Sequence, residues 1–278
     1  AKDRRQRQMC IRDRFKMDKF KINGPSKIRG EVSISGSKNA ALPILAATLL
    51  FDKNVTIKNL PRVKDIDTML NLLKSLGRKI SFKSNKKIAT ISKGKKNNFF
   101  APYSLVKTMR AGILVLGPLL AKNKKAKVSS PGGCSIGVRP IDIHLKAISK
   151  LGVKIQIEKG YVNAKAQEGL VGSEIRFSKI SVGATENSIL AACLANGTTT
   201  IKNCAIEPEI KDLTNFLKTA GAKIKWIGKR TLKIEGVKTL KSITYSIMND
   251  RIEAGTFCVA ACLNSGNLKI KNFEPKVI

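Results

Sequence analysis

The chain has 278 residues, 42% of them hydrophobic, which is enough for one large or two ordinary domains with a sizeable core. It carries 53 lysine and arginine residues against 19 acidic ones, a formal net charge of +34. The longest apolar run, 40–51, contains a proline and is too short to span a bilayer, so we expect a soluble, cytoplasmic protein that has no membrane partner.

A charge this high would ordinarily suggest a nucleic-acid partner. The lysines, however, are scattered along the chain, aromatic residues are few, and no helix-turn-helix, RNA-recognition or zinc-finger pattern is recognisable. We therefore interpret the excess as a solvated surface and predict no nucleic-acid partner. Six cysteines without a C-x-x-C pair and a single histidine also make a metal site improbable, and we expect no cofactor.

Residues 1–16 differ from everything that follows. They contain five of the thirteen arginines and show no clear apolar periodicity. We expect Met17 to be the true start and residues 1–16 to be an extraneous, disordered basic extension.

Short strands and helices are predicted from Met17 onward. Residues 20–22 and 31–34 are expected to form strands on either side of a Gly-Pro turn, and an apolar helix is predicted over 40–50. Lys38 and Asn39 would then lie at a helix N-terminus, where backbone N–H groups and the helix dipole favour an anion. The alternative is an ordinary helix start with a solvated lysine.

A repeat emerges when the turns after the apolar helices are aligned. Asn59, Ser130, Asn203 and Asn272 follow similar strand segments and lie about 70 residues apart. Each unit is predicted to run helix, strand, loop, helix, strand, with a glycine capping the second helix. Three units are complete, and a fourth covers 252–278. The first helices, over 111–121, 189–195 and 255–263, are apolar almost all round and should be buried, which places helices inside and sheets outside.

The stretch 129–140, SSPGGCSIGVRP, must be a loop because it holds three glycines and two prolines. Such a loop could bring the Cys134 thiol and the bidentate Arg139 guanidinium to one substrate. The alternative is a structural turn with a half-buried cysteine. Only eight arginines lie beyond residue 16, so we interpret Arg110 and Arg139 as places where a lysine would not suffice.

Six segments, occurring in order, carry a resemblance to a known family: SGSKNAALPILAATLL, VKTMRAGILVLGPLLA, SSPGGCSIGVRPIDIHLKAISKLG, SVGATENSILAA, EPEIKDLTNFLKTAGAKI and DRIEAGTF. Residues 17–278 resemble the enolpyruvyl transferases, most closely those acting on UDP-N-acetylglucosamine. The branch that makes 5-enolpyruvylshikimate-3-phosphate lacks the cysteine loop and is the weaker match.

The resemblance implies an inside-out α/β barrel of repeated subdomains, with two similar domains. Residues 38–247 would form the complete first domain, while 17–37 and 248–278 would be a fragment of the second. We also expect the intact protein to be a monomer and to need no cofactor. Because the family's general-base aspartate and further arginines would follow Ile278, we expect the polypeptide as given to be a fragment without appreciable transferase activity.

The implied reaction transfers the enolpyruvyl group of phosphoenolpyruvate to the 3′-hydroxyl of UDP-N-acetylglucosamine, the first committed step of peptidoglycan synthesis. Both substrates are anionic small molecules, which suits lysine and arginine. Two alternatives stay open: an enzyme of the shikimate branch, and a non-catalytic module that binds a nucleotide sugar or nucleic acid.

The resemblance also assigns roles to individual residues. Cys134 matches the family cysteine, a proposed general acid or aid to product release and the target of fosfomycin; Lys38 and Arg139 join it as catalytic residues. Lys38, Arg110 and Arg139 would contact phosphoenolpyruvate and Asn39 the sugar. The expected nucleotide contacts are Pro140, Ile141 and Asp142 at the uridine and Lys179, Ser181, Val182 and Gly183 around the diphosphate and uridine.

Four further positions are given no catalytic part. Residues 185–187 continue the SVGATEN motif without a separate role. The only histidine, His144, is interpreted as a satisfied residue at a helix start rather than a catalytic one. The cysteines other than Cys134 are expected to be small core residues.

Overall fold

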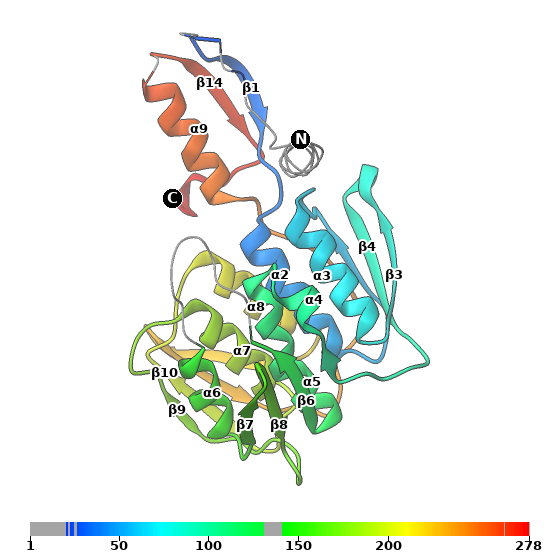
Figure 1. The fold of residues 1–278 in the computed structure, drawn as a ribbon. Coiled ribbons are helices and arrows are strands. Elements are labelled where there is room, and N and C mark those ends of the chain that lie inside the picture. Colours follow the sequence, from blue (N-terminus) through cyan, green and yellow to red (C-terminus); the bar gives the residue numbers. More distant parts are fainter. Residues whose placement is uncertain (1–20, 22, 25–26, 131–140, 264, 278) are drawn as a thin grey trace, which may run out of the picture.

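The computed structural model describes residues 21, 23–24, 27–130, 141–263 and 265–277. Within them lie three four-stranded sheets and one two-stranded sheet (Figure 1). The strands are β1 (Arg29–Ser33), β2 (Val55–Lys58), β3 (Arg78–Lys83), β4 (Ile88–Lys93), β5 (Phe100–Ala101), β6 (Lys125–Ser129), β7 (Lys154–Glu158), β8 (Tyr161–Lys165), β9 (Glu174–Arg176), β10 (Thr198–Lys202), β11 (Lys223–Gly228), β12 (Thr231–Glu235), β13 (Ile243–Ser246) and β14 (Asn267–Lys271).

The α-helices are α2 (Lys38–Ala47), α3 (Lys64–Ser75), α4 (Tyr103–Val106), α5 (Leu116–Asn123), α6 (Asp142–Ser149), α7 (Val182–Ala192), α8 (Pro208–Thr219) and α9 (Arg251–Leu263). Short 3₁₀ helices are η1 (Thr48–Leu50), η2 (Ser84–Lys86), η3 (Arg110–Val115) and η4 (Pro275–Val277). The helix expected over 40–50 thus begins two residues earlier and ends as a 3₁₀ turn.

The three large sheets share one topology. Their strand orders are β13-β2-β4-β3, β5-β6-β8-β7 and β9-β10-β12-β11. In each, an edge strand pairs parallel with the unit's first strand, and the remaining pairs are antiparallel. The sheets therefore confirm the repeated subdomain predicted from the 70-residue period.

One strand exchange interrupts this regularity. β5 and β9 precede the helices of their own units and pair with β6 and β10. By contrast, β1 precedes α2 but pairs with β14, whereas β13 precedes α9 but pairs with β2. The sheet of the first unit thus has as its edge strand the one that precedes the last unit, and the sheet of the last unit has the one that precedes the first.

The turns of the repeat share one backbone conformation, and the glycine caps of the second helices are as predicted. Asn59, Asn203 and Asn272 adopt left-handed backbone conformations with φ of 59°, 61° and 55°. Asparagine tolerates this region better than most residues with a side chain. The glycines that end the second helices, Gly77 and Gly152 among them, also have positive φ.

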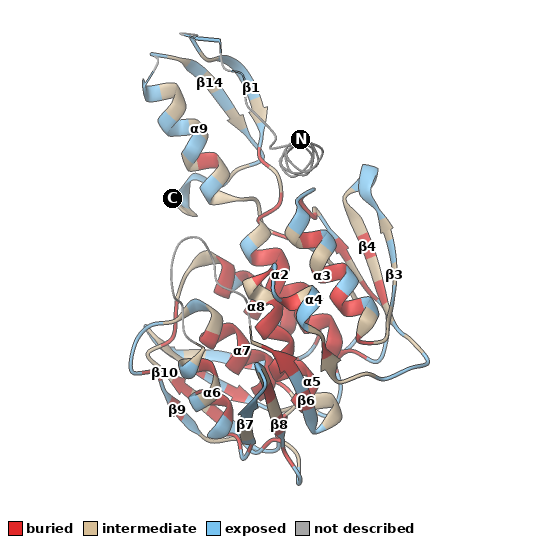
Figure 2. Cartoon of the chain, in the orientation of Figure 1, coloured by how far each residue is buried: buried red, intermediate tan, exposed pale blue. Residues whose placement is uncertain are grey.

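Helices form the interior of the three-sheet body and the sheets form its outside (Figure 2). Helix α2 is buried from Ala40 to Ala47, and α7 from Ala184 to Ala192. The sheet strands alternate between buried and exposed residues, as expected for one solvated face. The predicted α/β class with internal helices is confirmed, while the described strands stay in separate sheets instead of closing into one barrel.

Helix α9 departs from the prediction that every apolar first helix is buried. Only Ala254 of α9 is buried, and Val259 and Leu263 are 60% and 79% exposed. Its main packing partner is β14, and the unit formed by β1, β14 and α9 stands away from the body (Figure 1). Cys258 and Cys262 are consequently exposed, so their expected core placement is wrong, whereas Cys193 and Cys204 are buried.

Two segments join this unit to the body and run side by side. The Ser37 N–H donates to the Met248 carbonyl (2.8 Å), and the Asp250 N–H donates to the Ser35 carbonyl (2.9 Å). The division into domains at 37 and 248 stays a prediction. In the part of the chain that the structure describes, no helix is both long and apolar enough to cross a membrane.

Candidate active site

A cleft of about 720 Å³ lies where many helices begin. Its lining includes the first residues of α2, η3, α7 and α9 and early residues of α3, α6 and α8. Because each helix N-terminus presents free N–H groups and a partial positive charge, their convergence makes the cleft suitable for an anionic ligand. The residues are Lys38, Asn39, Leu42, Pro43, Asp65, Lys107, Thr108, Met109, Arg110, Ala111, Ile113, Leu114, His144, Ser181, Val182, Gly183, Glu186, Glu207, Glu209 and Arg251.

Helices α2 and α7 begin in the same way. Ser37 caps α2 and accepts a hydrogen bond from the Ala40 N–H, and Ser181 caps α7 and accepts one from the Ala184 N–H, both at 3.3 Å. A serine N-cap satisfies one N–H and leaves the others of the first turn for a ligand. The equivalent N-termini of α2 and α7, in two units of the repeat, therefore both line one cleft.

Acidic residues are as frequent as basic ones in the described lining of the cleft, unlike in the chain as a whole. Among the described residues, four basic and four acidic ones line it. Lys38 forms an ion pair with Asp65 (3.0 Å), and Arg251 holds the buried Glu209 through two contacts of 2.9 and 3.4 Å. An incoming anion would compete with Asp65 for Lys38, since that pair is partly exposed and so only weakly stabilising.

Two further glutamates lie in the cleft. Glu186 is 5% exposed. One carboxyl oxygen of Glu207, Oε2, is buried without a hydrogen-bond partner. Burial raises the pKa of Glu186 well above its usual value, and the neighbouring Glu209 and Glu207 raise it further.

His144 is a buried, uncharged member of the cleft. Burial, assisted by the nearby Arg110 charge, lowers the pKa of His144 to about 4. The Asn187 amide lies 3.4 Å from its Nδ1, and Asn187 also donates to the Ile113 carbonyl and accepts from the Gly117 N–H. The histidine is therefore neutral near pH 7 and supported from α7.

The structure brings together six of the residues expected from the sequence: Lys38, Asn39, Arg110, Ser181, Val182 and Gly183. Ile141, Asp142 and Lys179 do not line the cleft, although Asp142 starts α6 and Lys179 is two residues before the α7 cap. Cys134, Arg139 and Pro140 lie outside the described residues, as does most of the loop they belong to.

Sequence reasoning missed the acidic side of the cleft. Glu186, Glu207, Glu209 and Arg251 all occur in quoted motifs but were given no role. The available signal was positional: in a chain with 19 acidic residues, three glutamates stand near helix starts of the repeated units.

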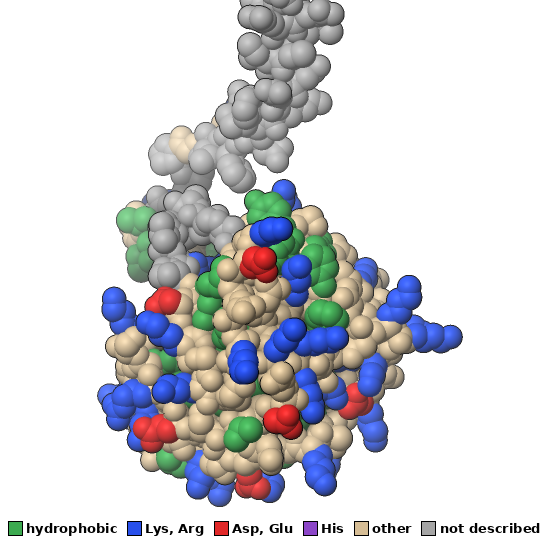
Figure 3. Space-filling model, turned by 60° about the horizontal axis from the view of Figure 1, so that its bottom comes forward, with side chains coloured by type: hydrophobic (Ala, Val, Ile, Leu, Met, Phe, Trp, Pro, Cys, Tyr) green, Lys and Arg blue, Asp and Glu red, His purple; other side chains and the backbone are tan. Residues whose placement is uncertain are grey.

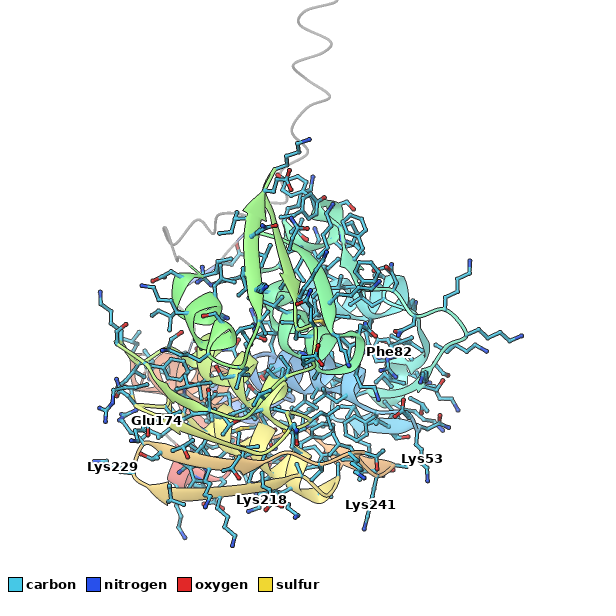
Figure 4. The ribbon with its side chains drawn as sticks, turned by 90° about the horizontal axis from the view of Figure 1, so that it is seen from below. Lys53, Phe82, Glu174, Lys218, Lys229 and Lys241 are labelled. Atoms are coloured by element: carbon cyan, nitrogen blue, oxygen red, sulfur yellow. The ribbon has the colours of Figure 1, made fainter. Side chains whose placement is uncertain are left out.

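Other site chemistries find less support. Among the described residues, no group of three or more histidine, cysteine or acidic side chains could hold a metal ion. Lysine and arginine are spread over the face shown in Figure 3, with acidic side chains between them. Figure 4 shows Lys53, Lys218, Lys229 and Lys241 on the periphery of the body. This dispersal agrees with a solvated surface.

Comparison with known proteins gives a consistent set of relatives. A family model described as EPSP synthase (3-phosphoshikimate 1-carboxyvinyltransferase) matches residues 22–278. The UDP-N-acetylglucosamine 1-carboxyvinyltransferase of Pelagibacter ubique (strain HTCC1062) is 63% identical over 262 residues, 94% of this chain. That of Psychrobacter sp. (strain PRwf-1) is 49% identical over 264 residues, also 94% of this chain. The chain spans 62% and 61% of the lengths of these two relatives.

Solved structures show the same fold at lower identity. The enolpyruvyl transferase NikO from Streptomyces tendae superposes with a TM-score of 0.77 at 22% identity, covering 86% of this chain and 56% of NikO. An EPSP synthase from Acinetobacter baumannii superposes with a TM-score of 0.70 at 20% identity, covering 86% of this chain and 54% of that one.

Proposed function

Because this chain belongs to the EPSP synthase (3-phosphoshikimate 1-carboxyvinyltransferase) family, we propose that the protein takes part in transferring the enolpyruvyl group of phosphoenolpyruvate to the 3′-hydroxyl of UDP-N-acetylglucosamine. The observation that carries the proposal is the cleft, where helix N-termini, Lys38 and Arg110 meet. The choice of sugar nucleotide rests on the 63% identical relative that bears that name.

The reaction would proceed by addition and elimination. The sugar 3′-hydroxyl gives up its proton to a base as its oxygen bonds to C2 of phosphoenolpyruvate, and the methylene carbon of phosphoenolpyruvate gains a proton from an acid, which gives a tetrahedral intermediate. Loss of a proton from that carbon then restores the double bond as the C–O bond to phosphate breaks. Phosphate, carboxylate and diphosphate all carry negative charge, so the ammonium of Lys38 and the guanidinium of Arg110 would hold them without a metal ligand set.

Individual roles follow the same chemistry. Lys38 and Arg110 would bind phosphoenolpyruvate, Asn39 the sugar, and Ser181 to Gly183 the diphosphate through the exposed start of α7. Cys134 and Arg139 are proposed to act from the neighbouring loop, with Cys134 protonating the methylene carbon. Pro140, Ile141, Asp142 and Lys179 would contact the nucleotide. The proposed role is in supplying peptidoglycan precursors in the cytoplasm.

Titration calorimetry on the full 278-residue chain tests this proposal. We expect UDP-N-acetylglucosamine to bind, and phosphoenolpyruvate added to that complex to bind at least tenfold more weakly to Lys38→Met than to the wild type, because a charge-assisted contact contributes more than about 1.4 kcal/mol. Lys53→Met, which removes an exposed lysine, is the matched control.

Two results would contradict the proposal. Binding of shikimate 3-phosphate in place of the sugar nucleotide would indicate the activity of the other branch of the family, which makes 5-enolpyruvylshikimate-3-phosphate. A steeply salt-dependent interaction with a single-stranded oligonucleotide, with no binding of either small molecule, would point to a nucleic-acid module.

A further inference from the structure

A hollow of about 440 Å³ lies on the outer face of the β5-β6-β8-β7 sheet. Residues that alternate with its lining, such as Val128, Val162 and Ala164, are buried beneath the sheet. Among the described residues, none lines both this hollow and the cleft, and Figure 1 shows β7 and β8 at the end of the body away from α9. The lining consists of Lys127, Gln156, Glu158, Lys159, Tyr161, Asn163 and Lys165.

Comparison of the three repeated sheets shows what is unusual about the charge of this face. Each sheet has a lysine two residues after the glycine that follows the unit's second helix, and this lysine opposes a different residue in each case. The pairs are Lys79 with Ser92, Lys154 with Lys165, and Lys223 with Glu235. Lys165 also opposes Lys125 on its other side, so the second sheet has three lysines in one row. Because like charges directly opposite one another destabilise a sheet, this row favours a bound anion.

The described side chains around the hollow do not neutralise this charge. Its lining has three lysines and one glutamate, and that glutamate, Glu158, opposes Tyr161 rather than a lysine. Two lysines of the sheet lie over aromatic rings: the Nζ of Lys125 is 4.3 Å from the ring centroid of Phe99, and that of Lys127 is 5.1 Å from that of Tyr161. Among the described residues, no ion pair is formed by Lys125, Lys127, Lys154, Lys159 or Lys165.

The third sheet provides a contrast. It also has two opposed lysines on its outer face, Lys225 and Lys233. There, however, Glu235 interacts electrostatically with both. The lysines of the second sheet therefore differ from those of the third in lacking a nearby carboxylate partner, and this difference does not follow from the high lysine content of the whole chain.

The uncharged lining residues indicate which kind of anion fits. Tyr161 supplies an aromatic ring on which a planar base can stack. Gln156 and Asn163 oppose each other on β7 and β8, and their amides supply hydrogen-bond donors and acceptors for the edge of such a base. The volume is that of a small-molecule site, and the row of lysines ends at β7, the edge strand of the sheet. These limits favour one small molecule over a long strand.

We propose that this hollow is a second ligand site, and that it binds a nucleoside triphosphate. Lys127, Lys159 and Lys165 hold the phosphates, the base stacks on Tyr161, and the two amides contact its edge. The inference uses no residue of the cleft, so it goes beyond the proposed function and does not depend on it.

Calorimetric titration of the full chain with ATP, in magnesium-free buffer at physiological salt, tests the contribution of the lysines. The wild type should bind ATP, and Lys159→Gln/Lys165→Gln should bind it at least about fivefold more weakly, because two individually weak charge contacts are lost together. The matched control is Lys225→Gln/Lys233→Gln, which removes the same charge from the third sheet and should stay within about twofold of the wild type.

Inorganic triphosphate tests the contribution of the base. It carries the same phosphate groups without a ring, so the wild type should bind it at least about fivefold more weakly than ATP. Tyr161→Leu should bind ATP nearly as weakly as triphosphate and leave the affinity for triphosphate unchanged. If this variant does not fold, the comparison of the two ligands on the wild type still decides whether the base is recognised.

Four results would overturn the inference and leave the proposed function standing. Equal affinities for ATP and triphosphate would show a site for simple anions, and equal losses in the two double variants would show diffuse attraction by the surface. Displacement of ATP by saturating UDP-N-acetylglucosamine would place ATP in the cleft. Tighter binding of a short single-stranded oligonucleotide, weakened by Lys159→Gln/Lys165→Gln, would assign the face to a nucleic-acid strand. Failure of UDP-N-acetylglucosamine to bind would count against the proposed function alone.

Discussion

At the scale of single residues, Glu186 links the chemistry of the cleft to the stability of the fold. Burial and the neighbouring carboxylates raise the pKa of its carboxyl in the folded protein, so the fold disfavours the ionised form of Glu186. The unfolded chain, by contrast, loses the carboxyl proton above about pH 4.3. A buried carboxyl of this kind is retained at some expense of stability.

We predict that Glu186→Gln becomes increasingly stabilised relative to the wild type as pH rises. A raised native pKa means that the unfolded state binds fewer protons, so the free energy of unfolding of the wild type falls by up to about 1.4 kcal/mol per pH unit between the two pKa values. Urea denaturation of both proteins at pH 4, 6 and 8 measures this. A stability difference that stays constant over that range would show that Glu186 is ionised in the fold.

His144 should behave in the opposite sense. Its native pKa of about 4 lies below the unfolded value of about 6.5, so its contribution to stability is complete above pH 6.5 and is lost as pH falls towards 4. Since the chain has one histidine, its Cε1 proton gives a single NMR titration to follow. A midpoint near 6.5 in the folded protein would exclude the buried, neutral ring.

The sequence was informative about residues whose type is tied to one kind of chemistry. Lys38, Asn39 and Arg110 were predicted as a group and do line one cleft. Glu186 was given no role from the sequence, because an acidic residue in the first turns of a helix is ordinarily a solvated one that favours the helix dipole. Only the packing of α7 among the other helices makes it a buried residue of the cleft.

At the scale of elements, the asparagine that follows the first strand in the first and third units fixes how the chain leaves the sheet. Asn203 has φ of 61°, and its side-chain Nδ2 donates to the Phe177 carbonyl at 3.0 Å, which ties β10 to the segment after β9. Asn59 does the same for β2, donating to the Ile247 carbonyl at 2.9 Å.

Replacement of Asn203 separates the contribution of its left-handed backbone conformation to stability from that of its side-chain hydrogen bond. We expect Asn203→Ala to cost about 2 kcal/mol, because it forces an alanine into the left-handed region and also removes the hydrogen bond. Asn203→Gly should cost about half as much, since glycine accepts the positive φ. Urea midpoints of the three proteins measure this; equal losses would mean that the backbone conformation contributes nothing.

The elements also show what periodicity can and cannot predict. An apolar helix was correctly predicted at α2 and α7, where sheets and other helices surround it. The same reasoning failed for α9, because an all-apolar sequence says that a helix favours burial but not which partner supplies the covering surface. The exposed Val259 and Leu263 follow from packing on a two-stranded sheet alone.

At the scale of the whole molecule, stability should be uneven. Helix α7 is buried from Ala184 onward, whereas α9 buries one residue. Regions with few buried contacts open locally at lower free energy than the core. We therefore expect the amides of α9 and β14 to exchange with deuterium at least 100-fold faster than those of α7 in the full chain. Mass-spectrometric exchange on peptides from 251–271 and 182–192 measures this, and similar rates would contradict it.

The traded edge strands β1 and β13 have a practical consequence for anyone who divides this chain. A fragment cut by the sequence repeat, ending before Ile243, would keep all of β2 to β4 and yet expose the full length of β2, whose backbone groups Val55 to Lys58 normally pair with β13. An open strand edge of that kind recruits other chains and promotes aggregation. A recombinant fragment that contains β2 should therefore end after Ser246, the last residue of β13. It should not end before Ile243, where the sequence repeat alone would place the boundary.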